Sequence, residues 1–125
     1  MTKRLEVYKC EVCGNIVEVL HEGKGQLVCC GKPMKVQTEN IVEASFEKHI
    51  PVLEKTEQGV RVYVSSEVHP MIEAHYIEWI QIIAGDKSCR QFLKANQAPE
   101  ALFAIDDENL EARAYCNLHG LWKGR

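Results

Sequence analysis

The sequence lacks the features by which a membrane protein or a nucleic-acid-binding protein is recognised. No apolar run in its 125 residues is long enough to span a membrane, and no apolar signal core follows the N-terminus. The chain has 15 basic and 18 acidic side chains, and a formal net charge of −3 offers no basic surface for nucleic acid. We therefore expect a cytoplasmic protein that binds neither a membrane nor nucleic acid.

Helical periodicity is weak throughout, whereas short stretches suited to β-strands recur. The segment 60–65 alternates valine with other residues, as a half-buried strand does, and 76–83 is the most apolar stretch and should be central. Further strands are expected at 42–48, 52–56, 88–95, 101–105 and 110–115. Short strands at this spacing predict an all-β protein with a β-sandwich over residues 42–125.

Six cysteines in an expected cytoplasmic chain indicate metal ligands rather than disulfides. Four of them lie in the first unit, residues 1–36, at Cys10, Cys13, Cys29 and Cys30. Cys-x-x-Cys-Gly is a metal knuckle in which Gly14 permits a tight turn, and four thiolates suit zinc or iron. The adjacent Cys29 and Cys30 should distort the tetrahedron. So small a unit also needs a metal to stabilise it, and the polar residues 37–41 follow as a linker.

The first unit should also contain a hairpin. A strand at 16–20 and a returning strand at 26–28, folded about Gly23, would set Cys29 and Cys30 just past the knuckle.

A second group of metal-ligating residues is scattered along the rest of the chain. It comprises His49, His69, His75, Cys116 and His119. A hairpin of 52–56 and 60–65 folded about Gln58-Gly59 would place His49 opposite Val68, next to His69. Alternation over 110–116 would put Cys116 on the apolar side of a strand. Tetrahedral zinc needs four ligands, so a fifth favours a redox metal of higher coordination number, such as iron.

These motifs resemble those of the desulfoferrodoxins, the two-iron superoxide reductases. The resemblance covers the whole chain and rests on Cys10-x-x-Cys13-Gly14, Cys29-Cys30, Glu47-Lys48-His49-x-Pro51, His69-Pro70-Met71-x-x-x-His75 and Cys116-Asn117-x-His119-Gly120. It implies a desulforedoxin-like first domain with a distorted Fe(Cys)4 centre. It also implies an immunoglobulin-like β-sandwich whose iron has four histidine nitrogens and one cysteine sulfur as ligands. The family is homodimeric.

The resemblance implies one-electron, inner-sphere reduction of superoxide to hydrogen peroxide without oxygen evolution, with electrons from a rubredoxin-like donor. Ferrous iron with one thiolate carries a charge of about +1, which attracts an anion even to an acidic protein. Two residues beside His49 are predicted to be catalytic. Lys48 would attract superoxide and hold a water that donates a proton. Glu47 resembles the family carboxylate that takes the sixth position of the ferric form.

Other interpretations are open at this point. The chain could be an electron carrier with two iron sites, or a binding module with zinc on four cysteines and an adventitious metal elsewhere. Glu47 and Lys48 could be a solvated surface ion pair. Cys89 is expected to be an inert or surface thiol and His21 an exposed side chain, while Trp122 could pack over the second site or only over the end of the sandwich.

Overall fold

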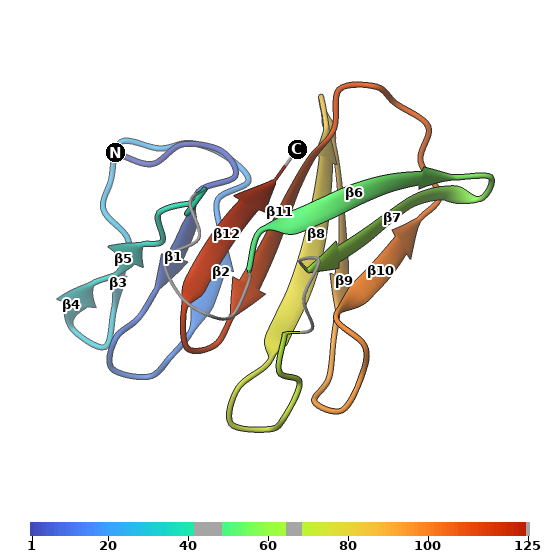
Figure 1. Cartoon of the computed structure of the whole chain (residues 1–125). Coiled ribbons are helices and arrows are strands. Elements are labelled where there is room, and N and C mark those ends of the chain that lie inside the picture. Colours follow the sequence, from blue (N-terminus) through green and yellow to red (C-terminus); the bar gives the residue numbers. More distant parts are fainter. Residues whose placement is uncertain (42–48, 65–68, 125) are drawn as a thin grey trace. The chain divides into compact units, whose positions relative to one another are not determined.

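The structure, a computed structural model, describes residues 1–41, 49–64 and 69–124. Within these residues the regular secondary structure consists of β-strands alone (Figure 1). The all-β prediction is confirmed. Among these residues there is no helix long and apolar enough to cross a membrane. The chain divides into two compact units, Met1–Thr38 and Glu39–Arg125, which are described separately below.

The first unit has a three-stranded antiparallel sheet in the order β2-β1-β5 and a separate two-stranded ribbon of β3 and β4. The strands are β1 (Val7–Lys9), β2 (Ile16–Glu18), β3 (Val28–Cys29), β4 (Lys32–Pro33) and β5 (Lys35–Val36). The predicted pairing of the returning strand with 16–20 is wrong, since β3 pairs with β4 across the Cys30-Gly31 turn. Only a few side chains of this unit are buried, among them Val7, Cys10 and Val19, so its apolar core is very small.

The second unit is a sandwich of two antiparallel sheets, in the orders β10-β7-β6 and β12-β11-β8-β9 (Figure 1). The strands are β6 (Pro51–Thr56), β7 (Gly59–Val64), β8 (Ile77–Ala84), β9 (Lys87–Phe92), β10 (Glu100–Phe103), β11 (Glu111–Cys116) and β12 (Gly120–Gly124). The apolar β8 lies between β11 and β9, in the interior of its sheet.

The core of the sandwich comes from the alternating residues that the sequence pattern singled out. Its members from the two sheets include Val62 on β7, Ile80 on β8 and Ala114 on β11, each fully buried. Burying one large aliphatic side chain contributes about 1.5–3 kcal/mol. Cys116, at the end of β11, belongs to this same cluster. The core therefore fixes one residue of the second predicted metal site.

The β6–β7 hairpin has a different register from the predicted one. Thr56 pairs with Gly59 and Pro51 with Val64, so the turn residues are Glu57 and Gln58 rather than Gln58 and Gly59. The register is shifted by two residues, which leaves every side chain on its predicted face because the strand period is two.

The segment 37–41, predicted as a linker, makes backbone hydrogen bonds at both ends. The Gln37 N–H donates to the Val7 carbonyl oxygen (2.7 Å) in the first unit. In the second unit the Asn40 N–H donates to the Leu121 carbonyl (2.9 Å), and the Lys123 N–H donates to the Asn40 carbonyl (2.9 Å). Asn40 thereby lies beside β12, the strand that follows the turn bearing His119.

Gly59 should be intolerant of a side chain. Its φ is +137°, and a Cβ would overlap the carbonyl oxygen of Phe103 on the neighbouring β10. We predict that Gly59→Ala lowers the free energy of unfolding by about 1–3 kcal/mol, as other overpacking changes do. Urea unfolding followed by the fluorescence of Trp79 and Trp122, both in the second unit, measures this. Gly25→Ala is the matched control, because a Cβ there meets nothing within 4 Å. Equal midpoints for the two variants would contradict the prediction.

Candidate metal centres

The first candidate centre is formed by two tight turns of the first unit. After β1, the Gly14 N–H donates to the Cys10 carbonyl (2.9 Å) with Gly14 at φ +84°, which closes the knuckle. On the ribbon, Cys30 and Gly31 at φ +53° and +72° reverse the chain between β3 and β4. Cys29 and Cys30 are adjacent in sequence and must both reach the same metal ion. The left-handed turn makes this possible, because it lets the two neighbouring side chains face one point.

The four sulfur atoms are spaced as metal-bound thiolates are. The Sγ atoms of Cys10, Cys13, Cys29 and Cys30 all lie within 4.8 Å of one another. Cys13 Sγ is 3.6 Å from Cys29 Sγ, which is 4.0 Å from Cys30 Sγ. A tetrahedral metal with bonds of about 2.3 Å to sulfur requires sulfur–sulfur distances of about 3.8 Å. The donor set and its spacing therefore fit zinc or iron.

The pKa values of these four thiols are shifted in opposite directions by their close packing. Backbone N–H groups, that of Cys13 above all, lower the pKa of Cys10 to about 6. Hydrogen bonds with Cys13 and Cys10 raise the pKa of Cys30 to about 12, and the pKa of Cys29 is raised for the same reason. Four close thiols cannot all ionise without compensation, so a metal ion is what would stabilise four thiolates here.

The second candidate centre is a closed ring of four imidazoles. Consecutive ring centroids are 4.7 Å (His49–His69), 4.8 Å (His69–His75), 5.0 Å (His75–His119) and 4.8 Å (His119–His49) apart. Each pair is inclined by 68° to 78°. Four imidazoles inclined to one another at these distances are spaced as the ligands of one metal are.

The donor atoms of this ring can be assigned in part. Nδ1 of His119 lies 3.1 Å from Nε2 of His49 and 3.8 Å from Sγ of Cys116. Nδ1 of His69 lies 2.7 Å from the Pro70 carbonyl oxygen, which leaves Nε2 of His69 for the centre. Two nitrogens about 2.1 Å from a metal, at right angles to each other, would be about 3.0 Å apart. The His119–His49 distance fits that value.

One thiol accompanies the imidazoles. Donor atoms of His49, His75, Cys116 and His119 lie within 4.8 Å of one another, and His69 joins the group through its ring contacts with His49 and His75. All five predicted residues are therefore brought together. Cys116, His49 and His69 are fully buried, whereas His119 is exposed, so the cluster is closed on one side and open on another.

A β-bulge directs Cys116 toward this cluster. Tyr115 pairs with Trp79 and Cys116 with Ile77, so the register of β11 against β8 shifts between Tyr115 and Cys116. A bulge bends the strand and changes the direction of the next side chain. The hairpin then closes with Cys116 paired to Gly120 at φ +86°, which leaves His119 in the turn. The sequence pattern gave no sign of this bulge.

Trp122 packs over the cluster, a point that the sequence left open. Its ring stacks on that of His49 at 4.6 Å and 15°, and its Nε1–H donates to the His119 carbonyl oxygen (3.1 Å). One side chain of β12 thus contacts His49, two residues before β6, and the turn of its own hairpin. A tryptophan three residues after a ligating histidine is the only sequence signal for this contact.

Two predicted residues cannot be placed. Glu47 and Lys48 lie outside the residues that the structure describes. Cys89 and His21 are both exposed.

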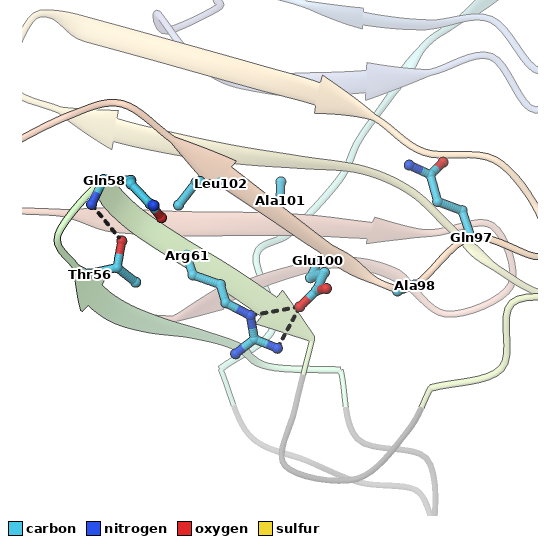
Figure 2. A pocket seen from close by; sticks show the side chains of 8 residues that line it. All are labelled: Thr56, Gln58, Arg61, Gln97, Ala98, Glu100, Ala101 and Leu102. Atoms are coloured by element: carbon cyan, nitrogen blue, oxygen red, sulfur yellow. Dashed lines mark hydrogen bonds and ion pairs between the residues drawn. The ribbon is translucent and has the colours of Figure 1, made fainter.

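The second unit also has a surface depression of about 460 Å³ that contains none of the predicted ligands (Figure 2). Its most polar feature is the Arg61 guanidinium, which is paired with the Glu100 carboxylate at 2.5 Å. Thr56 Oγ1 accepts from the Gln58 N–H (3.2 Å). These lining groups already bind one another, so the depression offers little to a ligand.

Comparison with protein families matches both units of the chain. Residues 2–36 match the model of the desulfoferrodoxin N-terminal domain, and residues 41–125 match the desulfoferrodoxin model. The chain belongs to the desulfoferrodoxin family. The curated desulfoferrodoxin of Desulfarculus baarsii is 58% identical to it over 98% of either chain.

Two further similarities concern the first unit and the whole chain, respectively. The desulforedoxin of Megalodesulfovibrio gigas is 57% identical over 37 residues, which is all of that protein and 30% of this chain. The crystal structure of the superoxide reductase from Treponema pallidum is 28% identical, with a TM-score of 0.82 over 99% of this chain and all of that one. The four-cysteine cluster and the cluster of four histidines and one cysteine match the two iron centres of desulfoferrodoxins. The prediction of two iron sites per chain is thereby confirmed.

Two substitutions of Trp122 should distinguish what its ring contact and its hydrogen bond each contribute to stability. Trp122→Phe keeps a ring against His49 and loses the N–H donor, so we expect a loss of about 0.5–1.5 kcal/mol in stability. Trp122→Ala loses both and should cost about 3–5 kcal/mol. The affinity of the second site for ferrous iron, measured by chelator competition, should fall further in the alanine variant. Trp79→Phe is the control, since Trp79 stacks on Tyr115 instead. Equal iron affinities in both Trp122 variants would contradict a role for the stack.

Proposed function

We propose that this chain is a superoxide reductase, which reduces superoxide to hydrogen peroxide by one electron and evolves no oxygen. The observation that carries the proposal is the closed ring of four imidazoles joined by the Cys116 thiol. The likeness to the superoxide reductase of Treponema pallidum over nearly the whole chain supports it.

We assign the ligands of the catalytic iron to five residues of the second unit. They are His49 and His69 through Nε2, His119 through Nδ1, His75 through a ring nitrogen, and Cys116 through Sγ. The iron of the first unit is assigned to Cys10, Cys13, Cys29 and Cys30. The two units, Met1–Thr38 and Glu39–Arg125, would then each carry one centre.

The chain's own residues define what this site can bind. Bound ferrous iron would supply the electron for superoxide. The four imidazoles are neutral donors and Cys116 is the one anionic donor, so the site keeps a net charge of about +1 and attracts an anion. Cys116 lies in the apolar core and His119 is exposed, which supports approach of a small anion from the solvent side.

The roles of Glu47 and Lys48 rest on their place in the sequence. Both directly precede His49, whose imidazole belongs to the ring. We propose that Lys48 attracts superoxide and holds the water that delivers a proton to the product. Glu47 would compete with the product for the iron in the oxidised protein. Five protein donors leave one position of a six-coordinate metal for such a group.

The partners proposed from the family resemblance are a rubredoxin-like electron donor and a second copy of the chain in a homodimer, in the cytoplasm. The four-cysteine centre is then either an electron relay or a structural site. Its small apolar surroundings support at least the structural role, because few other contacts stabilise the first unit.

The decisive experiment is product stoichiometry. A pulse of superoxide is given to the fully reduced protein while oxygen is followed in parallel, and metal analysis establishes two irons per chain. We expect one peroxide for each superoxide consumed and no oxygen. One peroxide per two superoxides with oxygen evolved would mean dismutation. If the protein does not react with superoxide, the result would favour an electron carrier. If metal analysis finds zinc in place of iron, the result would favour a binding module.

The role of Lys48 can be tested by ionic strength. Lys48→Ile should reduce the second-order rate constant with superoxide by about tenfold or more at low salt, because local steering contributes at least that much. The difference should shrink as salt screens the charge. Lys87→Ile, an exposed position on β9, is the control and should react as the wild type does. An unchanged rate at every ionic strength would exclude steering by Lys48.

A further inference from the structure

Asn117 occupies a special place between two residues of the second cluster. It follows Cys116 at the end of β11 and lies in the turn that carries His119. The side chain is half-buried and turns away from its own hairpin toward the loop that bears His75.

Three hydrogen bonds join Asn117 to the two residues that flank His75. Asn117 Oδ1 accepts from the Tyr76 N–H (2.9 Å), and Asn117 Nδ2–H donates to the Ala74 carbonyl oxygen (3.1 Å). The Asn117 backbone N–H donates to the Tyr76 carbonyl oxygen (3.2 Å). The peptide groups on either side of His75 are therefore fixed to the residue next to Cys116.

The loop that is held in this way also makes hydrogen bonds within itself and with its neighbours. Ile72 and His75 exchange backbone hydrogen bonds of 3.1 and 3.0 Å, which close a tight turn within the loop itself. The Ile77 N–H also donates to the Met71 sulfur (3.4 Å). The Asn96 N–H donates to the Met71 carbonyl oxygen (2.5 Å). These contacts close the turn and join Met71 to β8 and to Asn96, whereas the Asn117 contacts tie the residues around His75 to the end of β11.

We propose that Asn117 is a positioning residue that sets His75 relative to Cys116 and so keeps the fourth imidazole in the ring. This inference rests on the ligand assignment made under the proposed function. The residue type suits the task, because a side-chain amide presents an acceptor and a donor in one plane. A carboxylate would place an oxygen against the Ala74 carbonyl oxygen, and a hydroxyl could not reach two peptide groups.

The test compares the full-length iron protein with Asn117→Ala, Asn117→Asp and the control Asn109→Ala. Asn109 is exposed, and it is the Asn109 backbone N–H that donates to Asp107 Oδ1 (2.9 Å). Chelator competition measures iron affinity, and Mössbauer spectra distinguish the iron with four sulfur ligands from the iron with mixed ligands. We expect both Asn117 variants to hold the second iron about 10- to 100-fold more weakly, as losses of outer-shell partners do. The quadrupole splitting of that iron should change, while the four-sulfur signal stays as in the wild type.

The aspartate variant distinguishes hydrogen bonding from packing. Aspartate has nearly the volume of asparagine, so a role in packing alone predicts normal iron binding for a folded Asn117→Asp. That result would overturn the proposal, as would wild-type spectra in both variants. If Asn117→Ala does not fold, the comparison rests on Asn117→Asp. A wild-type protein with no mixed-ligand iron signal would overturn the ligand assignment first, and the role of Asn117 with it.

Discussion

The second cluster depends on the β11–β12 hairpin, which supplies two of its residues and directly contacts two others or their neighbours. The hairpin itself supplies Cys116, aimed by a bulge, and His119 in the turn. Trp122 on the returning strand stacks on His49. Asn117 binds the peptide groups around His75, and His69 contacts the rings of His49 and His75. A hairpin that is half embedded in a packed core is a rigid base, so segments far apart in sequence can be held at metal-ligand spacing.

The first unit shows the opposite relation between metal and fold. It buries few apolar side chains, and its four sulfurs are arranged by glycine-assisted turns rather than by a core. Backbone N–H groups lower the pKa of Cys10, while hydrogen bonds with Cys13 and Cys10 raise the pKa values of Cys29 and Cys30, so four thiolates at this spacing call for a cation. In this unit the metal would stabilise the fold, whereas in the second unit the fold stabilises the metal site.

The sequence predicted those features that follow from composition and period. Valine alternation located β7, the apolar run located β8, and the cysteine and histidine motifs contained every member of both clusters. It failed where a choice depended on turn geometry. Gly59 was taken as a turn residue although it begins β7, and the tight Cys30-Gly31 turn paired β3 with β4 instead of with an earlier strand.

Other features could not be foreseen because they depend on contacts between distant residues. The bulge before Cys116 arises from the register of β11 against β8, and no residue in β11 signals it. The stack of Trp122 on His49 joins positions 73 residues apart, and stacking leaves no periodic pattern. Which imidazole nitrogen faces the centre also depends on the fold, since the sequence distinguishes neither nitrogen of a histidine.

Asn40 and His49 are both held on β12, one by backbone pairing beside Trp122 and the other by the ring of Trp122. The sequence between them therefore begins and ends on the same strand. A substitution that displaces β12 would therefore move Asn40 and the His49 imidazole together.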